Sequence, residues 1–254
     1  ARLDAYNPMI PGDAERSGIP FACFRWLFRN PGSVPVEVAV AGSVENFIGA
    51  GGAGKPEAYT NTYREGEGFS GVFLDSTGGD RRGRDIGTLA LVAEGDGTCR
   101  TAWHSTGRWN TQILAFWDDF SADGALQDPP GNPPIGEARP HASIARKLTL
   151  APGAEASVTF LLAWHFPNRT AAGCGWSTPE DPGFIGNYYT TQFADAWDVA
   201  AKAWPQLSTL EADTVAFVEA FCASDLPQPV KEAALNNLST LRSQTCFRTA
   251  DGLF

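Results

Sequence analysis

Residues 160–169, FLLAWHFPNR, lie where the sequence changes from one periodicity to another, and this change decides the fold class. Upstream of this stretch, short apolar runs alternate with Gly, Pro and Asn turn residues. Downstream, apolar residues recur every three to four positions, as in FADAWDVAAKAW at 193–204. A period of two is typical of β-strands and a period near 3.6 of helices. The sequence therefore predicts a mainly β domain followed by α-helices.

Eight apolar runs upstream of residue 170 have the composition of strands. They cover residues 19–30, 34–41, 69–74, 86–93, 98–104, 111–117, 142–150 and 156–166. Pro-Gly turns at 30–33 and 151–154 each separate two runs, and each pair is predicted to form an antiparallel hairpin. Many short strands joined by such turns indicate an antiparallel β-sandwich, which we assign to residues 1–190.

Three helices are predicted after residue 190, over 191–204, 208–223 and 229–242. An apolar stripe marks the first helix, and Pro205 is expected to break or kink it. Ser208 and Glu211 have the spacing of a capping box for the second helix. We treat residues 191–223 as a helical linker and 224–254 as the truncated start of a further domain. Five apolar side chains are expected to be buried and to hold helix against sheet or barrel, rather than to bind sugar: Trp164, Phe193, Trp197, Trp204 and Leu238.

Composition limits the functional class. Of the 254 residues, 43% are hydrophobic and 19% are charged, as in globular chains. A net charge of -10 with scattered Lys and Arg argues against nucleic acid and anionic membranes as partners. No apolar run approaches the roughly 20 residues that a membrane helix needs. We expect a soluble protein, with the cytoplasm favoured over other compartments. The opening ARLDAYNP shows neither an initiator Met nor a signal peptide, which suggests a piece of a longer protein.

One glycine-rich stretch formally matches nucleotide-binding motifs. Residues 49–55, GAGGAGK, satisfy part of a P-loop and of a dinucleotide fingerprint. A P-loop needs Ser or Thr after the Lys, but Pro56 stands there, and no helical pattern follows. We interpret the stretch as a surface loop and predict no cofactor.

The usual catalytic and metal-binding patterns do not occur in the sequence. The five cysteines are widely spaced without a CxxC pair, so buried free thiols are expected rather than a zinc site or a disulfide framework. The three histidines, His104, His141 and His165, have no partner at ligand spacing, and a hydrogen-bonded structural role is expected for each. No GxSxG motif is present. We assign no metal ligand and no catalytic residue within this chain.

Two predicted loops, 117–123 and 173–187, carry the candidates for substrate binding. Trp117, Asp119 and Trp176 place aromatic and carboxylate groups among turn residues, where binding contacts are common. Adjacent residues in extended chain point to opposite faces, so Asp118 and Asp119 are not expected to form a glycosidase pair. The other interpretation of these Asp residues, and of Asp123, is that they cap the turn before Gly124.

Several short segments, in their order and spacing, resemble glycoside hydrolase family 116, which includes β-glucosidases and glucosylceramidases. They include 4–8 (DAYNP), 117–120 (WDDF), 162–167 (LAWHFP), 195–197 (DAW) and 224–227 (SDLP). The resemblance covers nearly the whole chain and is densest after residue 145.

This resemblance implies a retaining β-glycosidase whose N-terminal β-sandwich packs on an (α/α)6 catalytic barrel. The family's Glu nucleophile and Asp acid/base would lie beyond residue 254, so no residue here receives either role. The β-glycoside substrate would be bound through that catalytic domain. Residues 246–248, CFR, depart from the animal enzymes and look more like a bacterial branch, which puts glucoside specificity in doubt.

Two other functions are consistent with the composition. A free-standing carbohydrate-binding module could use exposed tryptophans as stacking platforms. The helical tail argues against it, because a module on its own would leave three apolar helix faces exposed. A purely structural domain cannot be distinguished from the glycosidase region by this sequence.

Overall fold

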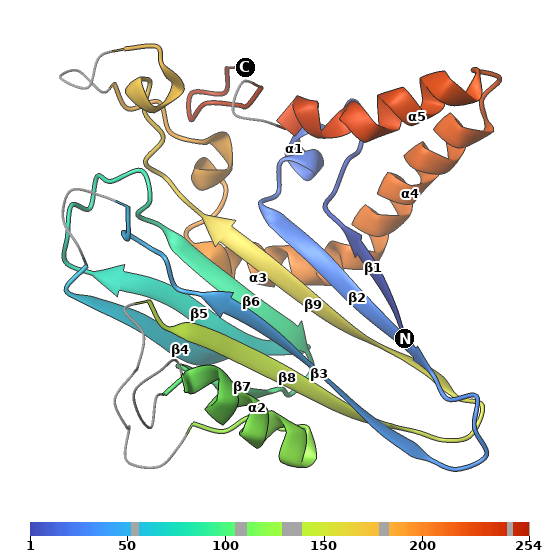
Figure 1. Cartoon of the computed structure of the whole chain (residues 1–254). Helices are drawn as coiled ribbons and strands as arrows, with labels where there is room; N and C mark the ends of the chain where they lie inside the picture. The colour runs from blue at the N-terminus through green and yellow to red at the C-terminus, as the bar shows by residue number, and fades with distance from the viewer. Residues whose placement is uncertain (52–55, 105–110, 129–138, 178–182, 243–245, 254) are drawn as a thin grey trace.

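The computed structural model describes all residues except 52–55, 105–110, 129–138, 178–182, 243–245 and 254. Two antiparallel sheets stack on each other, and helices cover the outer face of the larger sheet (Figure 1). The six-stranded sheet has the order β1 (Arg2–Tyr6), β2 (Phe21–Arg29), β9 (Glu155–His165), β6 (Thr88–Glu94), β5 (Phe69–Thr77) and β4 (Ala58–Gly66). The three-stranded sheet has the order β3 (Val36–Glu45), β8 (His141–Leu150) and β7 (Thr98–Arg100). The predicted β-sandwich is confirmed.

The helices fall in two groups. Two lie before strand β8, α1 (Ala14–Ser17) and α2 (Gln112–Asp123). Three follow the last strand: α3 (Ala196–Ala203), α4 (Leu207–Ala223) and α5 (Gln228–Asn237). Short 3₁₀ turns connect the later elements: η1 (Ala172–Cys174), η2 (Tyr188–Thr191), η3 (Trp204–Gln206) and η4 (Leu238–Arg242). Three helices follow the sandwich as predicted, but α3 begins five residues after the predicted start and α5 ends five residues before the predicted end.

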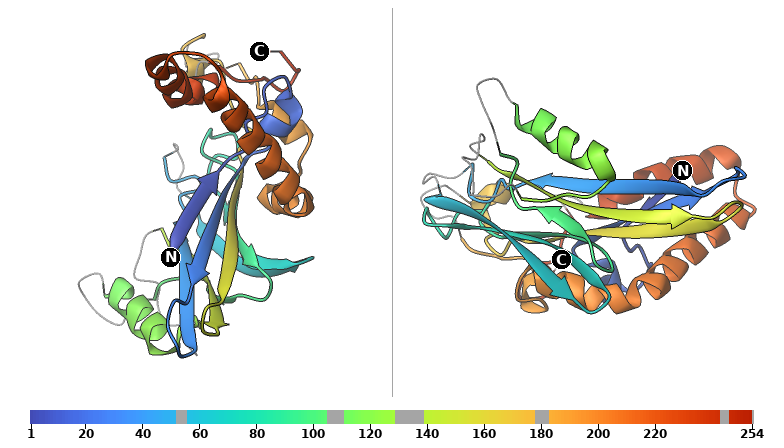
Figure 2. Two further views of the ribbon diagram at one scale, coloured as in Figure 1. Left: turned by 90° about the vertical axis from the view of Figure 1, so that its right-hand side faces the viewer. Right: turned by 90° about the horizontal axis from the view of Figure 1, so that it is seen from below.

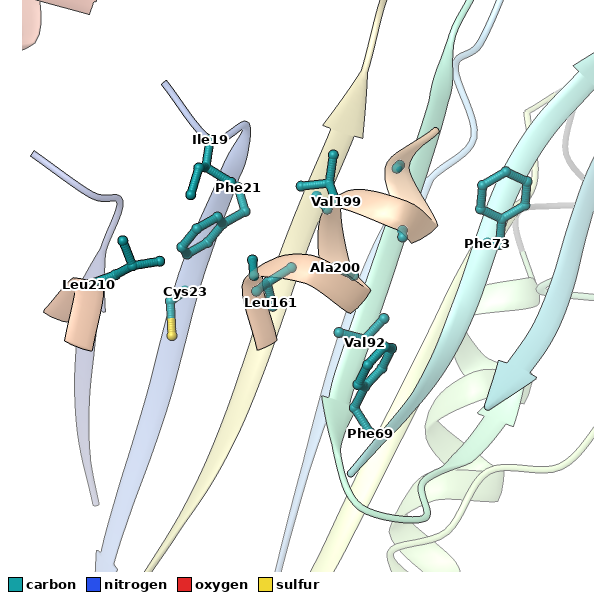
Figure 3. Close-up of a cluster of buried hydrophobic side chains, with 14 residues drawn as sticks. Ile19, Phe21, Cys23, Phe69, Phe73, Val92, Leu161, Val199, Ala200 and Leu210 are labelled. Atoms are coloured by element: carbon teal, nitrogen blue, oxygen red, sulfur yellow. The ribbon is translucent and has the colours of Figure 1, made fainter. Parts of the chain in front are cut away.

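The large sheet is buried on both faces along its central strands. On β9, Phe160 faces the small sheet and Leu161 faces helix α3, because successive side chains of a strand point to opposite sides. The helix-side core, drawn in Figure 3, also includes Phe21 and Val92. Buried strands of this kind show continuous apolar runs instead of alternation, which accounts for the sequence of β5 and β6.

Helix α3 packs closely on the large sheet because its buried face carries small side chains. Asp195 caps its first turn by accepting a hydrogen bond from the backbone N–H of Asp198 at 2.8 Å. The buried positions are Ala196, Val199, Ala200 and Ala203. They lie beside the predicted apolar stripe, which contains Phe193, Trp197 and Trp204.

The predicted burial of the five large apolar residues is only partial. Each is half-buried. Trp197 and Trp204 flank the close helix–sheet contact, with ring centroids 5.2 and 5.1 Å from that of Phe69. The alanine face leaves too little space between helix and sheet for an indole ring. The predicted capping box at Ser208 is also wrong, because α4 begins at Leu207 directly after η3 and its N-cap has no side-chain hydrogen bond.

The two predicted hairpins are wrong. The turn after β2 leads into β3 of the other sheet, and the turn after β8 leads into β9 of the first sheet. β2 instead pairs with β9, and β3 pairs with β8, so the two connections cross between the sheets side by side. Turn residues identify a reversal of the chain but not whether the next strand joins the same sheet.

Asn30 holds the two crossing connections together. Its side-chain amide donates to the carbonyl oxygens of Val34, Leu150 and Ala151 at 2.8, 3.0 and 3.2 Å. Its backbone N–H donates to Ala154 at 2.9 Å. Because Asn30 is only 4% exposed, water cannot replace these bonds.

The run at 111–117 is a helix, although a strand was predicted. It forms the first part of α2, which packs on the outer face of the small sheet (Figure 2). Phe116 and Phe120, one helical turn apart, stack with a centroid distance of 6.0 Å, and Phe116 also stacks on Trp103 at 4.7 Å. Gly124 ends the helix with a φ of 78°, a left-handed conformation that favours glycine.

We predict that Asn30→Ala destabilises the protein by about 1–3 kcal/mol, because the buried Leu150 carbonyl and two part-buried carbonyl groups lose their side-chain donor. Thermal and urea unfolding measure the change. Asn237→Ala is the matched control: this amide lies on the exposed face of α5 and bonds to the Ala233 carbonyl one turn back, and the variant should unfold like the parent protein. An equal loss in both variants would contradict a special role for Asn30.

Candidate functional site: the junction of the sandwich and the C-terminal helices

The structure does not bring the three predicted substrate-binding residues together. Trp117 and Asp119 lie on α2, a helix where the sequence predicted a loop. Trp176 follows η1 at the opposite end of the molecule (Figures 1 and 2). Trp117 and Trp176 are 58% and 62% exposed. One ring face of Trp176 stacks on Phe247, with a centroid distance of 5.4 Å.

The carboxylates around α2 stabilise the helix and the chain that follows it. Asp119 accepts from the backbone N–H of Gln127 at 3.1 Å and lies 3.5 Å from the guanidinium of Arg100. Arg100, a buried residue, also donates to the carbonyl of Ala115 at 3.0 Å. Asp123 accepts from the backbone N–H two residues on, which confirms the turn-capping interpretation for that residue.

The structural role predicted for the three histidines is found at His165, and the predicted free thiols are found. His165 Nε2 lies 2.9 Å from the carbonyl oxygen of Phe193, and burial lowers the pKa of this imidazole. All five cysteines are free thiols, but only Cys23 is buried. The glycine-rich stretch 49–55 lies largely outside the described residues, as does part of the 173–187 loop. Within the described part of the chain, no group of three His, Cys, Asp or Glu residues is placed to hold a metal ion. None of its helices has the length and apolarity to cross a membrane.

The strongest candidate for a functional site is the junction where the N-terminal segment meets helix α4. The hydroxyl group of Tyr6 donates to the carbonyl oxygen of Leu207 at 2.9 Å, and the backbone N–H of Met9 donates to Thr214 Oγ1 at 3.1 Å. Burial raises the pKa of the Tyr6 hydroxyl far above its ordinary value, and it raises that of the adjacent Cys23 thiol to about 11. Both groups therefore stay neutral and serve as hydrogen-bonding and packing groups.

Two ion pairs add to this junction. Arg25 of β2 pairs with Glu211, and Arg16 of α1 pairs with Asp213. Each pair is partly exposed, so solvent screens it and each contributes little to stability. Their two carboxylates lie on the same turn of α4 but bind different elements, which fixes the rotation of the helix about its axis.

A third link joins residues near the two ends of the chain. Arg248 Nη1 lies 2.6 Å from Glu15 Oε1, and its guanidinium lies 3.4 Å from the ring centroid of Tyr188. Hydrogen bonds from Arg248 lower the pKa of the Glu15 carboxyl group. The backbone supports the link, because the Tyr188 N–H donates to the Arg248 carbonyl at 3.0 Å. We call these three sets of contacts, which join residues 6–25 to α4 and to Arg248, the clasp.

A pocket of about 510 Å³ lies beside the clasp. Residues from the N-terminal segment, from η2, from η4 and from 246–248 line it, so its walls come from parts of the chain far apart in sequence. Glu15, Arg169 and Arg248 give it a polar edge, and most of the rest is apolar. A concave apolar pocket with a few convergent polar groups has the general character of a ligand site.

The carboxylates that line this pocket are unsuited to acid catalysis. Asp13 lies 2.6 Å from Arg16 Nε, and Glu15 pairs with Arg248. Hydrogen bonds from these arginines lower the pKa of each carboxyl group, so both are ionised at neutral pH. A glycosidase needs one carboxyl that keeps its proton until it reaches the leaving group. This pair of residues would therefore not hydrolyse a glycoside bound in the pocket.

Sequence reasoning did not identify the clasp. Its contacts join residues about 200 positions apart, and the periodicity of a short stretch of sequence cannot reveal such pairs. The only signal was the segment 4–8, which the family resemblance singled out without giving Tyr6 a role.

We predict that Tyr6→Phe destabilises the protein by about 0.5–1.5 kcal/mol, because the half-buried Leu207 carbonyl loses its donor. Tyr63→Phe is the control, since the Tyr63 hydroxyl makes an exposed contact of 3.3 Å to Glu65. Urea unfolding of both variants measures the difference. No difference between them would show that the tyrosine contact does not stabilise the junction.

We also predict that acid opens the Glu15–Arg248 link. Because the folded pKa of Glu15 lies below its ordinary value of 4.5, its contribution is complete above pH 4.5 and is lost as the pH falls through the folded pKa. Hydrogen-exchange protection of the Tyr188 and Ala250 amides should then fall. Glu15→Gln should show low protection at every pH, whereas Glu155→Gln, which removes an exposed pair with Arg29, should behave like the parent protein. Protection in Glu15→Gln that follows pH as in the parent would contradict the link.

Comparison with known families gives one match. A family model described as beta-glucosidase 2, glycosyl-hydrolase family 116 N-term, matches residues 1–210. No curated protein matches the chain. The match includes both sheets, helix α3 and the start of α4, and it ends at Leu210, a fully buried residue of the helix-side core. The β-sandwich with its packed helices is thus the N-terminal domain of glycosyl-hydrolase family 116, and the chain belongs to that family.

Proposed function

We propose that this chain is the N-terminal region of a retaining β-glycosidase that acts on β-glucosides. In this proposal the chain carries an (α/α)6 catalytic barrel that begins near residue 224 and lies mostly outside the 254 residues. Residues 1–190 would form the sandwich domain and 191–223 the linker. The observation that supports the proposal best is the clasp. It holds α4 to the sandwich through contacts beyond residue 210, where the family match ends.

The surface of α4 and α5 fits this proposal. Beyond Thr214, which is 9% exposed, the helices project from the sandwich (Figure 2). Val215, Val218 and Val230 are 43%, 37% and 48% exposed. Apolar side chains gathered on helices in this way favour packing against further helices, as the first helices of a barrel would require.

The chemistry would come from two carboxyl groups in the barrel. A retaining glycosidase places its nucleophile and its acid/base about 5–5.5 Å apart across the scissile bond. The acidic residues that line the junction pocket are held ionised by arginines and are not such a pair. The sandwich would act by positioning the barrel. Activity on glucosylceramide-like substrates and a bacterial origin are further parts of the proposal that rest on sequence resemblance alone.

A carbohydrate-binding module without catalytic activity is the alternative. Trp117 and Trp176 are exposed enough to stack on a sugar ring. They lie at opposite ends of the molecule, however, and one face of Trp176 is already covered by Phe247. A single free tryptophan face offers little area, which is why we favour the glycosidase proposal.

The proposal predicts that the longer protein carrying this chain hydrolyses an aryl β-glucoside with retention of configuration, and that residues 1–254 alone do not. Retention is read by NMR from the anomer of the first-formed sugar. Turnover by the purified 254-residue chain would contradict the proposal if it disappeared on mutating Asp13 or Glu15. The absence of hydrolysis by the longer protein on any β-glycoside tested would contradict it as well.

The positioning role has its own test in the longer protein. Thr214→Val removes the acceptor of the Met9 N–H from the clasp without touching the proposed barrel site. We expect turnover to fall several-fold while the two catalytic carboxyl groups are unchanged. Thr190→Val is the control, because its hydroxyl bonds to the Asn187 carbonyl at 2.7 Å, within one turn of chain. Equal activities of the two variants would show that the clasp does not position the catalytic part.

A further inference from the structure

We propose that the junction pocket binds an amphiphile made of an apolar body and a hydroxyl-rich head, the chemistry of an alkyl or aryl glycoside bound through its non-sugar part. The choice of a sugar as the head rests on the proposed function. The apolar subsite itself is inferred from the pocket alone.

The size and walls of the pocket indicate the apolar body. Its volume of about 510 Å³ is in the range of small-molecule sites, roughly 300–1,000 Å³. Met9 and Ile10 line one side, and Leu238 and Leu241 line it from η4. Leu241 is 57% exposed although it borders a concavity. An apolar ligand would remove these side chains from water, which is favourable in proportion to the area covered.

The polar edge of the pocket indicates the head. Arg169 donates through Nε to Asn187 at 2.7 Å, and its guanidinium lies 3.9 Å from the ring centroid of Phe247. Among the described residues, no carboxylate forms an ion pair with Arg169. Glu15 adds a carboxylate acceptor at the same edge.

This mixture of donors and acceptors favours hydroxyl groups over a carboxylate. A hydroxyl both donates and accepts, so it can bond to the guanidinium and to the carboxylate together. A carboxylate only accepts, so it could bond to Arg169 but not to Glu15, whose charge is already paired with Arg248. The net charge of -10 for the whole chain disfavours an anionic ligand further. We therefore infer a neutral, hydroxylated head.

Three probes test the inference on the 254-residue chain by titration calorimetry. They are octyl β-glucoside below its critical micelle concentration, methyl β-glucoside and octanoate. We expect saturable binding of octyl β-glucoside that is at least about tenfold tighter than that of methyl β-glucoside, because each buried methylene adds to affinity. Octanoate should bind more weakly than octyl β-glucoside. No saturable binding of octyl β-glucoside, or equal binding of the two glucosides, would overturn the apolar subsite. Octanoate binding as tightly would overturn the hydroxylated head.

Two variants locate the site. Leu241→Asp places a charge in the apolar wall and should weaken octyl β-glucoside binding at least about fivefold. Leu114→Asp is the matched control, because Leu114 is 60% exposed on α2 at the other end of the molecule, and it should bind like the parent. If Leu241→Asp unfolds, Gln192→Trp replaces it as the test variant. Gln192 is an exposed residue at the pocket, and the larger tryptophan ring would fill part of the pocket. Unchanged affinity in a folded pocket variant would overturn the location.

The amphiphile site and the proposed glycosidase function can be contradicted independently of each other. Loss of the predicted binding would leave hydrolysis by the longer protein untouched and would remove only the subsite. Octyl β-glucoside binding at the pocket with no glycosidase activity in the longer protein would keep the amphiphile site and remove the proposed function.

Discussion

The burial of the large sheet on both of its faces is the constraint on which the rest of the structure depends. Along β9, odd and even positions enter two different cores: Phe160 packs toward the small sheet and Leu161 toward helix α3. A shift of one residue in the pairing of β9 would exchange the two sets of side chains. The register Phe24↔Phe160 and Ala90↔Ala163 is therefore required by both cores at once. This coupling makes the sandwich and its covering helices depend on each other.

The two coupled cores also fix the position from which the following part of the chain starts. The helices on the large sheet share a core with the strands, so whatever comes next along the chain begins from a defined position. The clasp continues this control beyond the core. The contacts from Tyr6 and Met9 fix the first half of α4, and the Glu15–Arg248 link fixes the residues after α5. A domain that positions a catalytic partner needs this kind of rigid connection, because small errors in geometry reduce catalysis strongly.

The sequence predicted those features that depend on neighbouring residues. The β-sandwich, the change to helices and the break at Pro205 all follow from periodicity and backbone chemistry. The features that depend on distant residues were missed. The Pro-Gly turns indicated that the chain reverses. They could not show that both connections run between the two sheets, or that Asn30 hydrogen-bonds one connection to the other. The apolar run at 111–117 has no clear periodicity, so it was predicted as a strand. In the structure it is helical, and Phe116 stacks on Trp103. The clasp and the pocket join both ends of the chain, so no local pattern encodes them.

Native-state hydrogen exchange of the 254-residue chain tests most directly whether sandwich and helices form one unit. The amides compared are those of Leu161 and Ala163 in β9 and of Val199 and Ala200 in α3. If the two cores depend on the same sheet, all four amides exchange only through global unfolding, with the same free energy and the same dependence on denaturant. If α3 exchanges with a clearly lower free energy than β9, the helices are merely attached to a self-sufficient sandwich, and the mutual dependence of the two cores is contradicted.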